Sequence, residues 1–387
     1  MFDYNKALLS QRAFVNTVWE KIDNKLKSVA ETSQNKLPYT TTDGKYDDMS
    51  KKCVTSWTNG FWAGIMWLMY YGTNNSVYRK AGETSEKLLD EALIKYNALD
   101  HDVGFLWHIS AGADYRITGN EKSRTRNMYA ANVLAARFNL QGGFIRAWNK
   151  WSDSEENLGT AIIDSMMNIN LLYWASSESG DPRFKYIAAR HAETTMKNHV
   201  RPDGSVKHIV LYDPYTGEYT DNLAGQGYSK HSSWSRGQAW ALYGFVLSYI
   251  HTEKTEFLDT AKRVANYFIT NICMDNYMAR VDFRAPREPE IYDSTADACA
   301  ACGLLELARV LPEDEGGVYF DAAIKILKTL DEKCCDYTAS EDSILQMGTE
   351  RYPQNGNMKG VHIPIIYGDY FFIEAIYKLK GFDILFW

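Results

Sequence analysis

The chain has 387 residues, enough for one large domain or two ordinary ones, and 45% of them are hydrophobic, which permits a sizeable core. A formal net charge of −7 argues against a nucleic-acid partner, although a small anionic ligand needs only a local basic pocket. Residues 1–30 lack the basic and apolar regions of a signal peptide, and no run of about 18 apolar residues predicts a membrane span. We therefore expect a cytoplasmic protein that binds neither nucleic acid nor membranes.

Helical periodicity recurs in twelve segments along the chain. In order, these predicted helices span residues 4–30, 58–72, 76–97, 104–117, 121–138, 159–177, 183–199, 234–250, 254–272, 293–310, 316–334 and 368–380. Short polar turns join them in pairs, and long connections separate the pairs. Residues 206–212 alternate loosely between apolar and polar and predict a strand, which a turn at 213–217 follows.

The alternation of short and long links indicates how the helices are arranged. Twelve helices in hairpins predict an all-α fold, an (α/α)6 barrel in which six inner helices are ringed by six outer ones. No obvious linker interrupts this pattern, so we expect a single domain over residues 1–387. Long loops gathered on one side of such a scaffold are where a site is usually built.

The segment from Gly159 to Ala175 is apolar nearly all round, which is typical of a buried helix. Asp164 would lie in the middle of this helix, with Asn168 four residues on and on the same face. A buried, ionised carboxylate without a partner is strongly unfavourable. Asp164 is therefore either one half of a structural pair or part of a helix face that lines a wet cavity.

Three further stretches place aromatic or polar side chains where they could meet a ligand. Trp57 opens the second helix and shares a face with Phe61, although core packing would explain it equally well. Asp102 lies at the start of the fourth helix, where a carboxylate also serves as a cap. Arg146 and Trp148 lie in a long loop and are expected to be more exposed than core residues.

A second group of candidates lies further along the chain. His208 falls in the predicted strand, where a lone histidine is commonly a surface or hydrogen-bonded residue, and Gln226 precedes the next helix. Arg236 and Trp240 share a face of that helix, and a guanidinium beside an aromatic platform suits an anionic sugar. Carboxylates amid aromatic residues are the usual equipment of glycoside chemistry.

Metal and redox chemistry find little support in the sequence. No HExxH, P-loop or GxSxG pattern occurs. Cys299 and Cys302 have CxxC spacing, but they lie in a helical pattern with no second pair nearby. We expect the six cysteines to be reduced packing residues, and we expect no metal and no other cofactor.

Several of these stretches together resemble the unsaturated glucuronyl hydrolases, glycoside hydrolase family 88. The resemblance extends from about Trp57 to Tyr377 and rests on the motifs WTNGFWAG, DHDVGF, AIIDSMMN, SWSRGQAW, DSTADACAACGLLE and IYGDYFFIEA. It implies an (α/α)6 barrel, in agreement with the helix count. The related unsaturated rhamnogalacturonyl hydrolases differ after W-x-R-G, where they tend to continue N-G-W instead of Gln238-Ala239-Trp240.

The resemblance also implies roles for individual residues. Asp164 falls on the general acid/base of the family, and Asp102 falls on its second aspartate. The substrate-contacting positions fall on Trp57, Trp148, His208, Gln226, Trp234, Arg236 and Trp240. Some family members have D-H-H-D before the second aspartate, whereas this chain has the shorter run Asp100-His101-Asp102. The local geometry there is thus a point for the structure to decide.

One loop bears on sulfated substrates. Family members that act on sulfated chondroitin fragments carry two serines and a lysine, spaced S-x-x-S-x-K, before the last helix. Lys359 occupies the lysine position in this chain, while Gln354 and Asn357 replace the serines. A lysine is a good point-charge partner for a sulfate. We expect Lys359 to contact sulfate. The alternatives are an exposed loop lysine without a partner and a preference for unsulfated substrates, because both serine hydroxyls are absent.

The chemistry that the resemblance implies is the hydration of a vinyl ether. The substrate is an unsaturated oligosaccharide left by a polysaccharide lyase, with a C4=C5 unsaturated uronate at its non-reducing end, and glycosaminoglycans are the expected source. Asp164 donates a proton to C4 and water adds at C5, so burial or Asp102 must raise the Asp164 pKa above its ordinary value of about 3.9. The alternatives are an unsaturated rhamnogalacturonyl hydrolase and a non-catalytic carbohydrate-binding toroid. The presence of both aspartates argues against the second.

Overall fold

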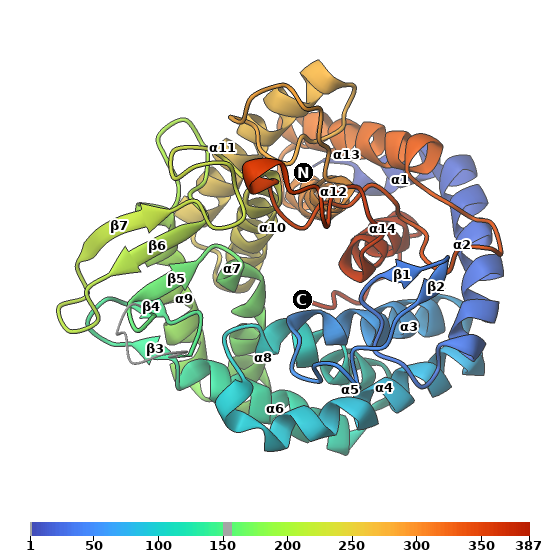
Figure 1. Ribbon diagram of the computed structural model, residues 1–387, viewed down its shortest axis with the longest axis horizontal. Coiled ribbons are helices and arrows are strands. Elements are labelled where there is room, and N and C mark those ends of the chain that lie inside the picture. Colours follow the sequence, from blue (N-terminus) through green and yellow to red (C-terminus); the bar gives the residue numbers. More distant parts are fainter. Residues whose placement is uncertain (1, 150–156) are drawn as a thin grey trace.

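The computed structural model describes residues 2–149 and 157–387, in which twelve helices pair into a closed double ring (Figure 1). The inner ring consists of α3 (Gly60–Thr73), α5 (Ala111–Thr118), α8 (Asn170–Ser179), α10 (Ser235–Thr252), α12 (Ser294–Val310) and α14 (Ile366–Leu379). The outer ring consists of α2 (Arg12–Thr32), α4 (Ser76–Ile94), α6 (Glu121–Ala135), α9 (Pro182–Asn198), α11 (Thr255–Ile272) and α13 (Glu313–Lys333). The pairs are α3–α4, α5–α6, α8–α9, α10–α11, α12–α13 and α14–α2. The predicted (α/α)6 barrel is confirmed.

The remaining elements are short. Two further helices are α1 (Tyr4–Ser10) and α7 (Ser165–Asn168), and a π-helical turn spans Gly104–His108. Single 3-10 turns span Trp57–Asn59, Tyr96–Ala98, Cys273–Asp275 and Gln354–Gly356. The strands are β1 (Thr41–Thr42), β2 (Lys45–Tyr46), β3 (Phe138–Asn139), β4 (Phe144–Ile145), β5 (Thr160–Ile162), β6 (Ile209–Tyr212) and β7 (Tyr219–Leu223). The first predicted helix is divided at Gln11, between α1 and α2.

Burial distinguishes the two rings. Every residue of α14 is buried, and so is every residue of α12 from Ser294 to Ala308, because these helices are enclosed by their neighbours. The outer helix α11 instead buries Phe257, Ala261, Val264 and Phe268, which recur at the helical period and form one apolar face. No helix in the described part of the chain is both long and apolar enough to cross a membrane.

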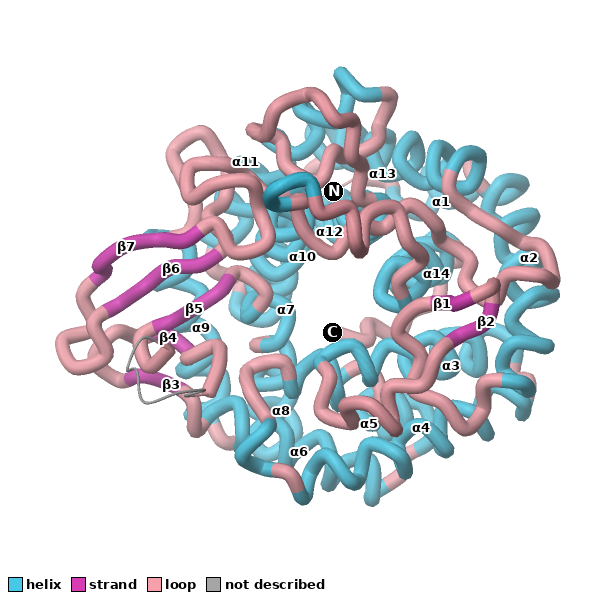
Figure 2. Tube along the Cα trace, in the orientation of Figure 1, coloured by secondary structure: helices cyan, strands magenta, loops and turns pink. Residues whose placement is uncertain are grey.

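A small antiparallel sheet in the order β5–β6–β7 lies at one edge of the ring, where long loops leave the helices (Figure 2). The strand predicted at residues 206–212 is confirmed over Ile209–Tyr212, which form β6. Its turn is confirmed by the hydrogen bond of 2.8 Å that the Gly217 N–H donates to the Asp213 carbonyl. The helix predicted from Gly159 is wrong at its start. Thr160 to Ile162 form β5, and helix begins only at Ser165, because an apolar run of this length is equally compatible with a buried strand.

Candidate active site

Asp164 lies at a change from strand to helix and not in the middle of a helix, as the sequence had indicated. It follows β5 by two residues and immediately precedes α7. The Ile163 N–H donates to the His208 carbonyl at 3.0 Å, which extends the pairing of β5 with β6 by one residue. Asp164 and His208 are thereby neighbours, and the His208 Nε2 lies 3.5 Å from the Asp164 Oδ2. Neither of these two atoms has a hydrogen-bond partner among the described residues.

A backbone hydrogen bond sets the orientation of the His208 ring. The Gln226 N–H donates to the His208 Nδ1 at 2.9 Å, so in the neutral ring the proton is on Nε2, the nitrogen that faces Asp164. The Trp234 ring packs on the imidazole, with 4.5 Å between the centroids. The half-buried Gln226 side chain donates to the Glu350 carbonyl at 2.7 Å and is anchored to the loop before α14. Three predicted site residues therefore lie together around Asp164.

Asn168 connects the second aspartate to this group. Its Nδ2 donates to the Asp102 Oδ1 at 3.1 Å and to the Asp164 backbone carbonyl at 3.3 Å, while its Oδ1 accepts the Phe105 N–H at 2.9 Å. A side chain on Gly104 would place its Cβ 2.6 Å from this Oδ1, so only glycine permits the approach of the loop. The short run Asp100-His101-Asp102 therefore still brings Asp102 to Asp164.

The two aspartates differ in their electrostatics. Burial raises the pKa of Asp102 well above its usual range, and the negative fields of Asp100 and Asp164 add to that rise. Burial also opposes the ionisation of Asp164, but the contact with His208 and the positive field of Arg236 outweigh it, so the pKa of Asp164 is lowered. The expectation that the surroundings raise the Asp164 pKa is therefore wrong for the protein without substrate. These opposite shifts favour Asp102 as the protonated member of the pair and Asp164 as the ionised one.

Aromatic rings continue the cluster away from His208. The Arg236 guanidinium lies 4.4 Å from the centroid of the Trp234 ring and 5.1 Å from that of the Tyr367 ring, so it is held between the two. Tyr367 in turn stacks on Trp57, with centroids 4.9 Å apart and planes inclined by 27°. A continuous chain of contacts thus joins Trp57 to Asp164.

Arg236 and Trp240 are more buried than a ligand-facing role suggests. Arg236 is 1% exposed, and it donates from Nη1 to the Asp293 Oδ2 at 2.5 Å and from Nη2 to the Glu350 carbonyl at 2.6 Å. Its Nη1 also donates to the Thr349 carbonyl at 2.7 Å. Trp240 is fully buried and packs on Phe105 with centroids 5.3 Å apart, one layer behind Trp57. Both residues lie within the cluster, but much of their contact is with the protein.

The two other predicted residues lie at its border. Trp148 is half-buried and packs against a small apolar group that includes Ile162 of β5 and Ile209 of β6. Lys359 is exposed, and the structure does not bring it into the cluster. It is nevertheless adjacent to Gly360, whose carbonyl accepts the Glu350 N–H at 2.9 Å. The predicted sulfate contact would therefore be at the rim.

Several residues of the cluster were missed by the sequence reasoning. Tyr367 belongs to the motif IYGDYFFIEA and Asp293 begins DSTADACAACGLLE, so the motifs were noted but not these side chains. The sequence indicated no role for His101 beyond its place in the run before Asp102. In the structure, its Nδ1 lies 2.9 Å from the Ser165 Oγ and its Nε2 lies 3.4 Å from the Asp102 Oδ1. Burial lowers the pKa of His101 to about 4, which keeps the ring neutral.

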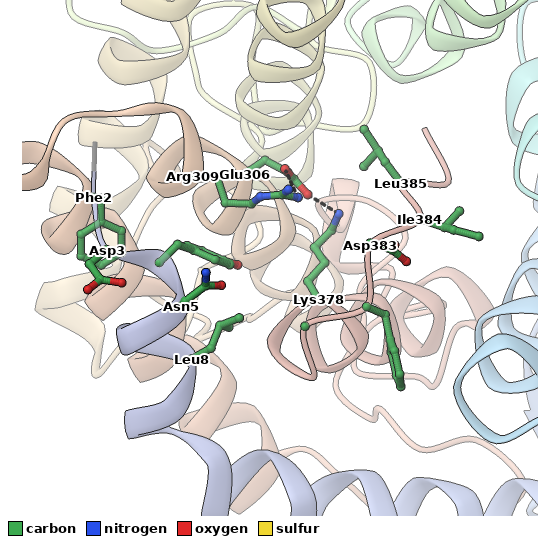
Figure 3. A pocket seen from close by; sticks show the side chains of 13 residues that line it. Phe2, Asp3, Asn5, Leu8, Glu306, Arg309, Lys378, Asp383, Ile384 and Leu385 are labelled. Atoms are coloured by element: carbon green, nitrogen blue, oxygen red, sulfur yellow. Dashed lines mark hydrogen bonds and ion pairs between the residues drawn. The ribbon is translucent and has the colours of Figure 1, made fainter.

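A cavity of about 400 Å³ lies elsewhere, at the far ends of α12 and α14 (Figure 3). Residues from the two terminal segments and from these helices line it, among them Asp3, Asn5 and Asp383. Glu306 and Lys378 form an ion pair of 2.5 Å in its wall. No predicted site residue lines this cavity, so it is separate from the cluster around Asp164.

Comparison with known proteins adds a second line of evidence. Residues 29–279 match the family described as Glycosyl Hydrolase Family 88. The chain belongs to glycosyl hydrolase family 88. It is similar to an unsaturated glucuronyl hydrolase from Bacillus sp. (strain GL1), with 36% identity over 331 residues that cover 84% of this chain and 86% of that protein. It is also similar to an unsaturated chondroitin disaccharide hydrolase from Streptococcus pneumoniae (strain ATCC BAA-255 / R6), with 33% identity over 338 residues that cover 86% of this chain and 84% of that protein.

Solved structures of unsaturated glucuronyl hydrolases agree with this assignment. The crystal structure of the unsaturated glucuronyl hydrolase from Bacillus sp. GL1 has a TM-score of 0.86 at 32% identity, covering 94% of this chain and 97% of that chain. A variant of the Streptococcus agalactiae enzyme complexed with dGlcA-GalNAc6S has a TM-score of 0.78 at 29% identity, covering 96% and 94%. The resemblance inferred from the motifs is thereby confirmed, and the chain is a glycoside hydrolase.

Proposed function

We propose that this family 88 enzyme releases the unsaturated glucuronic acid from the non-reducing end of oligosaccharides that polysaccharide lyases produce. Its relatives are named unsaturated glucuronyl hydrolases and unsaturated chondroitin disaccharide hydrolases, which favours substrates derived from glycosaminoglycans over the rhamnogalacturonyl alternative. The observation that carries the proposal is the pair Asp102 and Asp164, joined through Asn168 beside an aromatic wall. A non-catalytic sugar-binding toroid would not need two adjacent buried carboxyl groups.

The proposed reaction adds water across the C4=C5 bond. Asp164 gives a proton to C4, water forms a bond to C5, and the proton that the water loses returns to the Asp164 carboxylate. The resulting hemiketal collapses and releases the next sugar. Asp164 therefore acts first as an acid and then as a base.

The protonation states of the two aspartates in the free protein suggest how the reaction starts. Asp102 holds a proton while Asp164 is ionised, because of the fields described above. The substrate brings a second anion, its own carboxylate, close to Asp164, and a neighbouring like charge raises the pKa of a carboxyl group. We infer that binding transfers the shared proton of the pair to Asp164, which then faces the double bond as an acid.

The remaining predicted residues receive roles in recognition. Trp57, Trp148 and Trp234 would form the walls around the unsaturated ring, with Trp240 behind them, and His208 and Gln226 would provide polar contacts. Arg236 would act through its positive field and through its Nε, which has no partner among the described residues, since Asp293 and two carbonyls already accept from its Nη atoms. Lys359 would meet a sulfate at the rim.

The ring would work as one catalytic domain over residues 1–387. The largest buried cluster of apolar side chains extends from Val15 to Trp387, which supports this view. A cytoplasmic location stays a prediction. Neither point affects the assignment of the reaction.

A panel of unsaturated disaccharides tests the function. Digests of hyaluronan, chondroitin, heparin, gellan and pectin would each be incubated with the enzyme, and loss of the ultraviolet absorbance of the C4=C5 bond would report turnover. We expect turnover on at least one disaccharide that carries unsaturated glucuronate. Turnover confined to the pectin product would favour the rhamnogalacturonyl alternative, and no turnover on any member would contradict the proposal.

A further inference from the structure

Tyr367, the second residue of α14, occupies a central place in the cluster that the proposed roles leave unused. Its ring is 1% exposed and lies between the Trp57 indole, at 4.9 Å, and the Arg236 guanidinium, at 5.1 Å. Contacts with these two neighbours restrict the orientation of the ring. The hydroxyl at its end is therefore directed by packing and not by a hydrogen bond.

No hydrogen bond of that hydroxyl is found among the described residues, although the residue is buried and buried tyrosines usually have a partner. The charged groups that act on its ionisation are Arg236, Asp293, Glu350 and Asp164, so it lies among the charges of the site. The hydroxyls of Tyr370 and Tyr377 in the same helix also lack partners, but these two are sealed in the core. The Tyr367 hydroxyl is not sealed in this way.

The site requires a hydrogen-bond donor for the carboxylate of the substrate. The substrate carboxylate is bonded to C5, one of the two reacting carbons, so it must bind close to Asp164. Arg236 supplies positive charge there, but Asp293 and the carbonyls of Thr349 and Glu350 already accept from its Nη1 and Nη2. Only its buried Nε has no partner among the described residues. Burial raises the pKa of the Tyr367 hydroxyl, so it stays protonated and remains a donor at any pH at which the enzyme works.

We propose that Tyr367 is a further substrate-binding residue, whose hydroxyl donates a hydrogen bond to the carboxylate of the unsaturated uronate. This inference rests on the proposed function. The hydroxyl and its position beside Arg236 point to an anionic acceptor, because the guanidinium attracts an anion while its Nη1 and Nη2 already donate to the protein. The ring would act as a rigid support, and the hydroxyl would supply the specificity for a free acid.

The test is Tyr367→Phe, which removes only the hydroxyl and keeps the ring between Trp57 and Arg236. A hydrogen bond to a charged group contributes about 1.5–3 kcal/mol, so we expect KM for the unsaturated disaccharide to rise about 10- to 100-fold. The kcat should change much less, because the carboxylate is bound in both the ground state and the transition state. Tyr370→Phe is the matched control, since it removes another partnerless hydroxyl of α14 from the core side.

A second measurement separates binding of the carboxylate from a structural effect. In an Asp164→Asn background, calorimetry would compare the affinity of the disaccharide with that of its uronate methyl ester, with and without Tyr367→Phe. We expect the substitution to weaken binding of the acid much more than binding of the ester. The melting temperature should not fall, because no hydrogen bond within the protein is lost.

The outcomes are distinct. If wild type turns over the disaccharide and Tyr367→Phe leaves KM unchanged, or weakens acid and ester equally, the role of Tyr367 is wrong and the proposed function stands. If wild type turns over none of the panel, the proposed function fails first. An equal rise of KM in Tyr370→Phe would likewise contradict a specific role of Tyr367.

Discussion

Two buried acidic clusters lie at opposite ends of α12 and α14, and they are built differently. At one end, Lys378 stands between two glutamates, with its Nζ 2.5 Å from the Glu306 Oε1 and 3.4 Å from the Glu374 Oε1. The hydroxyl of Tyr243 and the indole of Trp387 donate to Glu374 as well. At the other end, the aspartate pair has no lysine or arginine within ion-pair distance in the described chain.

The difference separates a structural cluster from a reactive one. Each carboxyl group beside Lys378 is compensated by a cation and hydrogen bonds, so a ligand has nothing to add. The Asp102 carboxyl group accepts from the Asn168 amide, which also donates to the backbone carbonyl of Asp164, and the Asp164 Oδ2 has no hydrogen bond among the described residues. A buried oxygen in this state is unfavourable in the free protein and becomes favourable only when a substrate or water supplies the missing partner. The hydrogen-bond and ion-pair partners of these four buried carboxyl groups therefore distinguish the structural pair from the reactive pair.

Loss of Asp164 should have the largest effect. Asp164→Asn keeps the shape of the side chain but cannot supply a proton, and general acid–base catalysis contributes about 100- to 10,000-fold. We expect kcat to fall by that factor while substrate binding and the unfolding free energy are retained. Steady-state kinetics, with denaturant unfolding as the control for folding, would measure this. A kcat within about tenfold of wild type would contradict the assignment.

The corresponding change in the structural cluster should affect stability and not catalysis. Lys378→Met leaves Glu306 and Glu374 without their common cation, and breaking a buried ion pair costs about 3–5 kcal/mol. We expect urea unfolding to show a loss of that size, with the kcat of the folded fraction unchanged. Lys333→Met, at an exposed position of α13, is the control and should change stability little. A loss of kcat as large as that of Asp164→Asn would erase the distinction between the clusters.

The pH profile examines the proton that Asp102 holds. Because burial raises the Asp102 pKa, the pair keeps one proton until the pH passes that raised value, and kcat/KM should then decline with rising pH. Asp102→Asn removes this titration, so the decline should move or vanish, and kcat should fall by about 10- to 100-fold, near the lower end of acid–base effects. An unchanged profile in Asp102→Asn would show that the proton is held elsewhere.

A third carboxyl pair allows a smaller test of the same physics outside the site. The single hydroxyl proton of Ser123 lies between Glu86 and Asp114, with its Oγ 2.6 Å from an oxygen of each, so one carboxyl group must itself be protonated. Burial and the field of Asp114 raise the pKa of Glu86 from 4.5 to about 8. The unfolded chain then releases this proton at lower pH than the folded one, so stability should fall as the pH rises from about 4.5 towards about 8.

Glu86→Gln should flatten this dependence, because the neutral amide needs no proton. Unfolding free energies at several pH values in this window would be compared with those of Glu91→Gln, an exposed position of the same helix. We expect Glu91→Gln to keep the slope of wild type. Equal slopes in wild type and Glu86→Gln would show that Glu86 does not hold this proton.

Substitution of Lys359, at the rim of the site, should have the smallest effect on activity. Lys359 is exposed, and exposed ion pairs contribute about 0.2–1 kcal/mol, so Lys359→Ala should raise KM for a 6-sulfated unsaturated chondroitin disaccharide by about 1.5- to 5-fold. The unsulfated disaccharide serves as the control and should be unaffected. Equal losses on both substrates, or none on either, would remove Lys359 from sulfate recognition.

The sequence could predict features that depend on residues close together in the chain, but not features that depend on contacts between distant residues. Helical periodicity is local, so the hairpins of the barrel could be recognised, and the motifs pointed to Asp102 and Asp164. The strand at Thr160–Ile162 was missed because its pairing with β6 joins segments almost fifty residues apart. The burial of Arg236 by Asp293 could not be seen either, since 57 positions separate the partners. The opposite pKa shifts of the two aspartates also depend on residues that are distant from them in the sequence.

The ladder between β5 and β6 has a consequence for protein engineering. Asp164 and His208 follow and precede strands whose register pairs Ile162 with Ile209, so backbone hydrogen bonds set the separation of the two side chains. The hairpin beyond Tyr212 lies outside this register. Its turn at residues 213–217 could be lengthened, shortened or exchanged for that of a relative without moving the aspartate from the histidine. A change in the length of that turn would therefore alter the surface at the edge of the sheet, while Asp164 and His208 keep their separation.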